Sequence, residues 1–487
     1  MQNNKKELLP RLGFFTTLMI VIGAVIGSGI FKKPATMADQ LGSPELMIAL
    51  WIGAGLLTLA GALTNAEIAS MITATGGQYV FFEKMYGRLI AFLYGWALFA
   101  VIQSGSIAAI AWVFAEYSQF FDAFLMPTFF TQQEILDSQM HIPFIGNIYF
   151  LKDFGIKIIT ASVILFLTFV NYFGIIFGGS LSAFFTVAKV TAILILVAFG
   201  FAWGGGSIDN FVRDASVYSY SSAGVMAGVI AALSGVLWSY DGWNNITYIA
   251  GEVKNPQINI PRALTLGTMI IIAVYVLINL AFLYVLPTEE MAQSTIVAAS
   301  VAQKAMGAVG AAFVSAAVMI STFGTTNGTI MVTARVYYAM ARNNMFFPWV
   351  GNTHKKWSTP ANALWLQAFW ASVLVFSGHF DTLTDMLIFV TWIFYAAGAV
   401  GVFVLRKKMP DVPRPYKVWG YPFVPIVFVI VAIAFVILTL FNEISAYNSG
   451  DAEIINSVFG LALVATGLPL FYYYEWKRKK RVSKNYW

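Results

Sequence analysis

The chain of 487 residues contains no cysteine. Structural disulfides and thiolate metal sites are therefore excluded, and cysteine usage says nothing about the redox compartment. Histidine is also scarce. His141, His354 and His379 all lie in segments predicted to be loops, and their spacing fits no metal site. We therefore expect neither a metal nor another cofactor, and nothing in the sequence favours an enzyme.

Charged residues are few. They make up 11% of the chain, and hydrophobic residues make up 59%, whereas a soluble domain has about 25% charged and 45–50% apolar residues. The mean hydropathy of +0.73 agrees with this imbalance. The apolar runs are about 18 to 25 residues long and do not alternate with polar residues, which predicts membrane-spanning helices rather than barrel strands. The net charge of +6 comes from basic residues scattered in short loops, a pattern that does not favour nucleic-acid binding.

We predict an all-α polytopic membrane protein with twelve spanning helices. Of the 29 Lys and Arg residues, 22 fall on the side of the N-terminus, six on the other side, and Lys189 within a span. Basic residues concentrate in cytoplasmic loops, so both termini are expected in the cytoplasm. The expected spans are 12–31, 44–72, 88–121, 153–172, 181–203, 222–252, 262–286, 301–340, 361–378, 383–405, 423–442 and 454–474.

The segments outside the spans carry few signals. No cleavage pattern follows the first apolar run, which is therefore expected to remain as a helix after the cytoplasmic residues 1–11. The longest loop, over 122–152, is expected on the outer side with a short surface helix or hairpin. The cytoplasmic tail over 475–487 contains the basic run 477–481, which suits a position near anionic lipid.

Two of the predicted helices carry interruptions. The first contains Gly27-Ser28-Gly29, and the sixth contains LWSYDGWNN over residues 237–245. Glycine costs about 1 kcal/mol relative to alanine in a helix interior, and Asp and Asn compete for nearby backbone groups. Breaks in the first and sixth helices indicate a repeat of five helices, over 12–203 and 222–405, with two peripheral helices over 423–474. Because five is odd, the halves are inverted, and paired breaks of this kind point to a transporter's substrate site.

An unwound turn in a spanning helix exposes N–H groups on one half-helix and C=O groups on the other. The N–H end suits a carboxylate and the C=O end suits an ammonium. Two such breaks side by side would bind the zwitterionic part of an amino acid, and the missing side chains at Gly27 and Gly29 would let it approach. The alternative is that the glycines only allow close packing of helices. The candidate substrate residues at the breaks are Ile26, Gly27, Ser28, Gly29, Trp238, Ser239, Asp241 and Gly242.

Several segments resemble a known family. GAVIGSGIFKKP (23–34), AEIASMITATGGQYVFFEKMYG (66–87) and SYDGWNNITYIAGEVKNPQINIPRAL (239–264) resemble the first, second and sixth helices, with adjoining loops, of the amino acid–polyamine–organocation superfamily. FFTVAKVTAILIL (184–196), with its lysine in the fifth helix, resembles the L-type amino acid transporter branch, and the bacterial serine/threonine exchangers in particular. The resemblance implies ten core helices as two inverted repeats, alternating access, and sodium-independent and often obligatory exchange.

The resemblance also implies a role for Lys189. In sodium-coupled relatives a cation lies between helices 1 and 8, and in this branch the lysine ammonium takes that place. Ser321 and Thr325, in the polar stretch STFGTTNGT of helix 8, would then face it. From the residues alone, Lys189 snorkelling to the interface and ordinary interhelical hydrogen bonds remain the alternatives.

Other polar residues in the spans have more than one role open to them. Asp241 would cap the broken helix, accept from a substrate ammonium, or carry a proton. Glu67 is expected in an inner-gate ion pair or helix cap, with Arg88, Arg335 or Lys254 as partner.

The remaining candidates lie around the expected pocket. Gln103 and Ser106 are candidate pocket residues in helix 3. Trp238 resembles an aromatic outer gate, with packing as the alternative, and Trp392 and Tyr395 are candidates for narrowing the inner path.

We therefore expect a secondary transporter of small or neutral L-amino acids in a bacterial inner membrane, working by exchange. The alternatives are a proton-coupled symporter, in which Asp241 or Glu67 titrates, and a membrane sensor of amino acids, which the short termini argue against. Animal relatives carry a disulfide-linked partner subunit. Without cysteine such a link is impossible, so we expect a monomer whose partners are the lipid bilayer and the L-amino acid.

Overall fold

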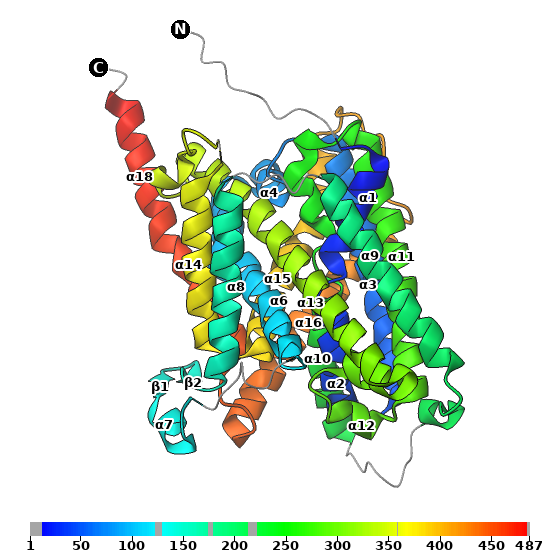
Figure 1. Cartoon of the computed structure of the whole chain (residues 1–487). Helices are drawn as coiled ribbons and strands as arrows, with labels where there is room; N and C mark the ends of the chain where they lie inside the picture. Colours follow the sequence, from blue (N-terminus) through cyan, green and yellow to red (C-terminus); the bar gives the residue numbers. More distant parts are fainter. Residues whose placement is uncertain (1–11, 122–128, 174–178, 213–221, 358, 485–487) are drawn as a thin grey trace.

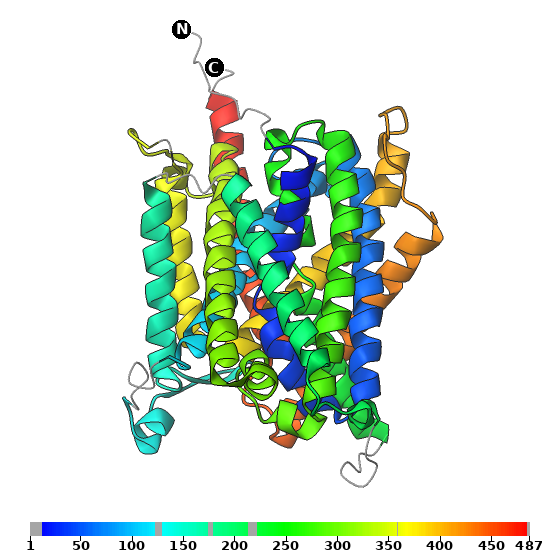
Figure 2. The same ribbon diagram turned by 45° about the vertical axis from the view of Figure 1, so that its right-hand side comes forward.

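The computed structural model describes residues 12–121, 129–173, 179–212, 222–357 and 359–484 as a bundle of long helices (Figures 1 and 2). Helices dominate because spanning backbone in hydrocarbon must bond within its own segment. The first five predicted spans correspond to α1 (Phe14–Val25) with α2 (Gly29–Leu41), α3 (Pro44–Met71), α5 (Arg88–Ala97) with η1 (Leu98–Ile102) and α6 (Gln103–Ser118), α8 (Phe154–Tyr172) and α9 (Gly179–Ala202). The next five correspond to α10 (Ser222–Ser239) with η4 (Trp243–Glu252), α11 (Pro256–Val285), α13 (Val297–Arg342), α14 (Ala361–Ser377) and α15 (Phe380–Lys408). The last two are α16 (Phe423–Ser449) and α17 (Asn456–Ala465) with α18 (Gly467–Lys484).

The count of spans is close to the prediction. In the described residues, eleven helical segments are long and apolar enough to cross a membrane. The expected ninth span, α14, is a shorter apolar helix of 17 residues. The chain is thus an all-α polytopic membrane protein, and the count of twelve remains a prediction.

The two broken helices run in opposite directions. The Leu12 N–H, just before α1, donates to the Glu252 carbonyl at the end of η4 over 2.9 Å, and the Lys254 N–H donates back to Leu12 over 2.8 Å. The start of the first helix therefore lies beside the end of the sixth. This antiparallel arrangement is the one that inverted halves require.

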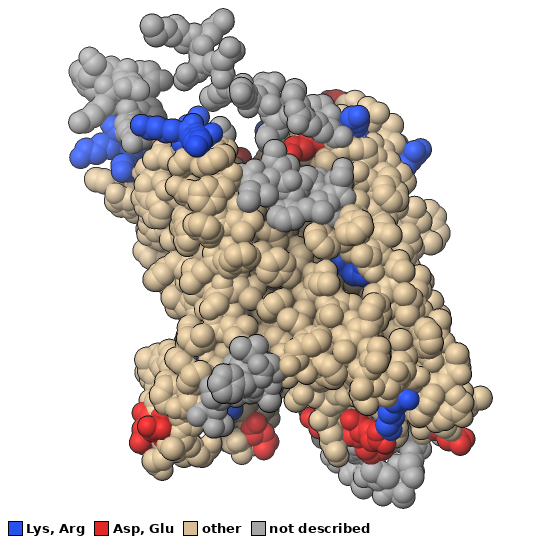
Figure 3. Space-filling model, viewed as in Figure 1, with Lys and Arg blue, Asp and Glu red and all other residues tan. Residues whose placement is uncertain are grey.

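The molecule has two chemically different ends. We call the end where α1 begins and α18 finishes the terminal face, and the other the opposite face. The terminal face is rich in Lys and Arg and the opposite face is rich in Asp and Glu (Figure 3). The opposite face carries α7 (Gln132–Asp137), the hairpin of β1 (Gln139–Ile142) and β2 (Gly146–Tyr149), and α12 (Thr288–Ala292) (Figure 1). The longest loop thus carries both a short helix and a hairpin, where we expected one or the other.

Two helices extend further than predicted. The first span was expected to stop at Phe31 because two lysines follow, yet α2 continues to Leu41. Lys32 and Lys33 therefore lie within the helix, where Glu116 and Asp381 offset their charges. The last span was expected to end at residue 474, yet α18 runs to Lys484, so the basic run 477–481 lies within this helix. Smaller elements are α4 (Gln78–Tyr86), η3 (Ile208–Phe211) and η5 (Pro348–Gly351).

Candidate functional site

The two helix breaks meet at one point inside the bundle. α1 ends at Val25 and α10 ends at Ser239, and the carbonyls of both residues accept from the Tyr275 hydroxyl of α11, each over 2.9 Å. The single hydroxyl proton of Tyr275 is thus shared between a terminal carbonyl of each broken helix. Sequence reasoning missed Tyr275, since a single tyrosine in an apolar helix has no distinguishing signal.

The first break leaves several backbone donors free. No N–H of residues 27 to 30 donates to a backbone carbonyl or a side chain in the part of the chain that the structure describes. These groups precede or begin α2, where the helix dipole places partial positive charge. They form an anion-binding end of the kind that suits a carboxylate.

Glycines allow the breaks to approach closely. A Cβ on Gly29 would lie 2.6 Å from the Ser239 Cα, and a Cβ on Gly242, whose φ is +98°, would lie 2.9 Å from the Ala24 carbonyl oxygen. A Cβ on Gly27 would meet the Thr325 methyl at 3.5 Å and the Val25 carbonyl oxygen at 3.8 Å, which are ordinary contacts. The missing side chain at Gly29 thus makes room for the sixth helix. Gly29 also lines a small cavity between the breaks, and the expected approach of a substrate there stays a prediction.

A small cavity lies between the breaks and helix 3. Of the candidate residues, it is lined by Gly27, Ser28, Gly29, Gln103, Ser106, Trp238, Asp241 and Gly242. The lining also includes Ala24, Val25, Ile110, Asn245 and Thr329, which sequence reasoning did not select. Gln103 follows directly on a π-helical turn, η1, an irregularity frequent at functional sites.

Two candidates at the breaks do not line the cavity. Ile26 is fully buried, and its carbonyl is turned toward Lys189. Ser239 packs against Gly29, and its hydroxyl donates to the Gly235 carbonyl over 3.0 Å. Both residues support the breaks through contacts with other helices and do not face the cavity.

Several polar atoms around the cavity have no partner. Among the described residues, buried atoms without a hydrogen bond include Ser28 Oγ, Gln103 Oε1, Trp238 Nε1 and Asn245 Oδ1. All four residues line this cavity. A buried polar atom left unpaired costs about 1–3 kcal/mol, so a cluster of them around one cavity indicates a polar ligand.

Asp241 is hydrogen-bonded to α15, which is the tenth span. Its Oδ1 accepts from the Tyr395 hydroxyl over 2.5 Å, and Asn244 Oδ1 lies 3.2 Å from the same hydroxyl. The Tyr395 ring also packs on Trp243, with ring centroids 5.3 Å apart. Hydrogen bonds and ring packing inside the bundle thus hold the break in the sixth helix against α15. Tyr395, selected from the sequence only as a narrowing of the inner path, is a direct partner of the aspartate.

Lys189 reaches the first break. α1 lies beside α9 (Figure 1), and the Lys189 ammonium donates to the carbonyls of Gly23 over 3.0 Å and Ile26 over 2.7 Å. Its third bond goes to Thr325 Oγ1 over 2.9 Å. These are the contacts expected from the sequence, and they use all three donors of the ammonium. With the side chain only 6% exposed, snorkelling to the interface is wrong.

Ser321 does not share this contact. In the described structure its hydroxyl has no partner, while its carbonyl accepts from Thr325 Oγ1 over 2.9 Å. It supports the lysine only through Thr325.

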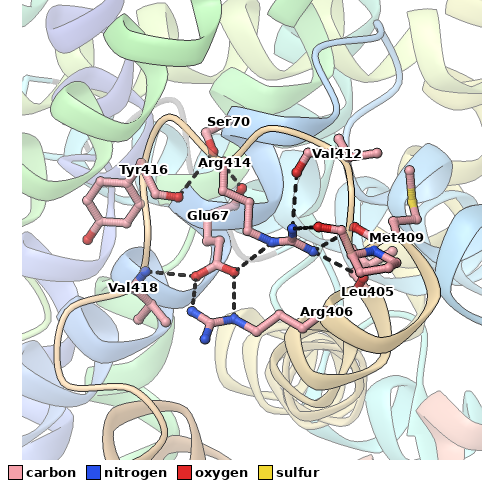
Figure 4. A network of polar contacts seen from close by, with 10 residues as sticks. Glu67, Ser70, Leu405, Arg406, Met409, Val412, Arg414, Tyr416 and Val418 are labelled. Carbon is pink, nitrogen blue, oxygen red and sulfur yellow. Dashed lines mark hydrogen bonds and ion pairs between the residues drawn. The ribbon is translucent and has the colours of Figure 1, made fainter.

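Glu67 is the centre of an ion-pair network at the terminal face (Figure 4). Arg406 donates to both carboxylate oxygens over 2.9 and 2.8 Å, and the Val418 N–H donates to Oε2 over 2.8 Å. Arg414 Nε lies 3.5 Å from Oε1. The network binds the end of α15 and the segment after it to α3, away from the cavity.

The partners expected for Glu67 were wrong. Arg88 pairs with Glu475 and Arg335 pairs with Glu252, while Lys254 takes no part in the network around Glu67. The reason is that the segment after α15 folds back over α3, which no local pattern in the sequence reveals. Among the described residues, no group of acidic and histidine side chains has the arrangement of a metal site.

Comparison with known proteins gives consistent matches. A family model described as amino acid permease matches residues 12–464. The serine/threonine exchanger SteT of Bacillus subtilis is 31% identical over 485 residues, covering 99% of this chain and 100% of that protein. The b(0,+)-type amino acid transporter 1 of Mus musculus is 28% identical, covering 98% and 91% of the two chains. The large neutral amino acids transporter small subunit 2 of Oryctolagus cuniculus is 28% identical, covering 97% and 82%.

Proposed function

Because the chain belongs to the amino acid permease family, we propose that it is a secondary transporter that exchanges small neutral L-amino acids by alternating access, without sodium. The observation that carries this proposal is the meeting of the two helix breaks. Free N–H groups of the first break line the same cavity as Asp241 of the second. An amino acid carries the two opposite charges that such a pair of ends binds.

In the proposed pose the backbone of an amino acid binds between the breaks in one orientation. Its carboxylate accepts from the N–H groups of residues 27 to 30, at the positive end of α2. Its ammonium lies toward the carbonyl end of α10 and Asp241. In this pose Asp241 contacts the substrate while Tyr395 holds the carboxylate in position.

The unpaired atoms favour a substrate whose side chain forms hydrogen bonds. Gln103 Oε1 and Asn245 Oδ1 accept from a hydroxyl or amide, and Trp238 Nε1 donates to one. An aliphatic substrate would leave these atoms unsatisfied. The substrates in the printed name of the Bacillus relative, serine and threonine, have side chains of this kind.

Lys189 accounts for independence from sodium. Its ammonium fills the space between the Gly23 and Ile26 carbonyls and Thr325, with every donor engaged. A cation placed there would meet a positive charge at close range. The lysine thus places its hydrogen-bond donors at the carbonyl end of α1, where helix carbonyls carry partial negative charge.

The proposed topology places the terminal face in the cytoplasm. Lys and Arg gather at that face (Figure 3), as expected for the inner side of a bacterial membrane. The chain has no cysteine for a disulfide-linked subunit, and we propose that it works as a monomer.

Exchange is tested by reconstituting the protein into liposomes. We expect labelled serine or threonine to enter only vesicles loaded with an unlabelled substrate, at the same rate with or without sodium and with or without a pH gradient. Uptake into empty vesicles driven by a pH gradient would contradict exchange and favour a proton-coupled symporter. Liposomes without protein give the background.

A further inference from the structure

Three helices are fastened together at the opposite face by Lys33. This lysine lies on α2, beyond the break in the first helix, and its side chain is only 2% exposed. Its ammonium lies 2.6 Å from Asp381 Oδ1 on α15, and 5.0 Å from the centre of the Phe380 ring. Its aliphatic stem runs along α10, where a Cβ on Gly235 would lie 3.0 Å from the Lys33 Cδ.

The helix α15, which is the tenth span, also binds α10, the first half of the broken sixth span. Asp385, one turn beyond Asp381 on α15, accepts from the Ser234 hydroxyl of α10 over 2.7 Å. Carboxylates four residues apart lie on one side of a helix. That side of α15 therefore contacts both half-helices that lie beyond the breaks, α2 and α10.

A second ion pair ties α2 to helix 3. Lys32 lies 2.8 Å from Glu116 Oε1 on α6, and the Trp112 indole donates to the same oxygen over 3.1 Å. The side chains of Lys32 and Glu116 are only 14% and 11% exposed. Helix 3 also lines the candidate cavity through Gln103, Ser106 and Ile110.

The ion pair on the other half-helix of the sixth span is looser. There η4 is linked to α13 by Glu252 and Arg335 at 3.8 Å, with side chains 26% and 32% exposed, and to α5 by the Tyr248 and Tyr94 hydroxyls, which lie 2.8 Å apart. The Glu67 network ties α3 to α15 and does not touch a half-helix. Among the described residues, the tighter and more buried ion pairs of the half-helices thus lie at the opposite face.

We propose that the Lys33–Asp381 and Lys32–Glu116 pairs, with the Ser234–Asp385 bond, form a gate that closes the cavity toward the opposite face. α2 begins at the cavity and α10 ends there, and the contacts lie on the parts of both helices that are more distant from the cavity. While the contacts hold, α2 cannot separate from α15 or α6, and α10 cannot separate from α15. Opening toward that face requires the lysines to leave their carboxylates. This inference rests on the proposed transport function only in that the cavity must open to both faces.

Water is available to replace the broken contacts. Asp381 and Asp385 also line a hollow of about 380 Å³ at the opposite face, between the β1–β2 hairpin and the start of α17. Asp381 is 33% exposed, in contrast to Lys33. When the gate opens, the carboxylates gain hydration from this side, which offsets the lost ion pairs. The Asp381 and Asp385 carboxylates are therefore not left buried without a partner when the gate opens.

The absence of cysteine allows a test without background labelling. Ile110→Cys places a thiol at the cavity, and Phe144→Cys places one on the 87% exposed hairpin residue. The side of the membrane from which Phe144→Cys reacts with a membrane-impermeant maleimide identifies the opposite face. The reagent is then applied from that side to Ile110→Cys vesicles without any amino acid, so the result does not depend on substrate or exchange.

We expect Ile110→Cys to react slowly in the parent and about tenfold faster when Lys33→Met or Asp381→Asn is added, because these changes shift the population toward the open state. Lys33→Asp combined with Asp381→Lys restores the pair in reverse and should return the rate toward that of the parent. Lys304→Met is the matched control, since Lys304 pairs with Glu290 at the same face but is exposed. It should leave the rate unchanged.

Rates equal to the parent in both Lys33→Met and Asp381→Asn would overturn the gate, as would equal acceleration by Lys304→Met. Elution as a single species on size exclusion and full labelling of Phe144→Cys in each background show that the variants are folded and inserted. If Lys33→Met does not fold, Asp381→Asn and the reversed pair decide alone. A failed exchange assay with accelerated labelling would count against the proposed function and leave the gate standing.

Discussion

The Lys189 ammonium donates to the Ile26 carbonyl over 2.7 Å, and the bond joins residues 163 positions apart in the sequence. The lysine thus occupies the carbonyl end of α1 at the point where the helix unwinds. Every other feature of the candidate site lies within the two breaks or in helices packed on them. This bond therefore ties the fifth helix to the geometry of the whole site.

Removing the lysine charge should abolish exchange. Lys189→Ala leaves the Gly23 and Ile26 carbonyls and Thr325 unpaired in a buried place, and we expect the uptake rate to fall by about 100-fold or more. The protein should remain in the membrane, as measured by its amount in washed membranes. Lys157→Ala is the matched control, since Lys157 is as deeply buried but donates to carbonyls near the hairpin. Parent-like exchange by Lys189→Ala would refute the role of the lysine.

Alanine substitution of Gly29 should distinguish the effect of a steric clash from the effect of a higher helix propensity. The added methyl of Gly29→Ala would lie 2.6 Å from the Ser239 Cα, whereas Gly53→Ala on α3 meets nothing within 4 Å. Both changes favour helix by about 1 kcal/mol. We expect Gly29→Ala to lower the melting temperature in detergent and to reduce exchange at least tenfold, and Gly53→Ala to do neither. Equal behaviour of the two variants would contradict the close approach of the breaks.

The pH dependence of exchange distinguishes the roles of Asp241. In the exchange account the carboxylate binds substrate and Tyr395, and carries no proton across the membrane. Asp241→Asn should therefore slow exchange about tenfold or more without changing the shape of its pH profile. Tyr395→Phe should slow it less, since the carboxylate remains. A pH-dependent rate in the parent that becomes flat in Asp241→Asn would instead support proton coupling.

The Glu67 network should contribute to stability rather than to substrate binding. Its carboxylate is 2% exposed and accepts from Arg406 and the Val418 N–H. Glu67→Gln should lower the free energy of unfolding by about 3 kcal/mol, seen as a lower melting temperature in detergent. Glu290→Gln, which breaks an exposed pair with Lys304, should change it by less than about 1 kcal/mol. An unchanged apparent affinity for serine in Glu67→Gln would agree with a structural role.

Much of the architecture could be predicted from the sequence, because hydropathy and loop charge act locally. The two breaks were predictable for the same reason, since Gly27-Ser28-Gly29 and Asp241-Gly242 are unsuited to helix interiors. The contacts of Lys189 followed from the resemblance together with the cost of a buried charge.

What could not be predicted depends on contacts between distant segments. Lys32 and Lys33 appeared to end a span because their partners, Glu116 and Asp381, lie 84 and 348 residues away. The partners of Glu67 lie on a returning segment, and Tyr275 looked like any apolar-helix tyrosine. Gly29 was assigned to the substrate although it faces Ser239, since a sequence does not show which neighbour a missing side chain accommodates.

The central claim, that an amino acid binds between the two breaks, is tested most directly by protection of a thiol. Ser106→Cys supplies the only thiol in the chain, at the wall of the cavity. Its rate of reaction with a small maleimide in detergent is measured with and without each amino acid. We predict that serine or threonine slows the reaction in a saturable manner, while Phe144→Cys is unaffected. Transport of an amino acid that gives no protection at Ser106→Cys would contradict the account.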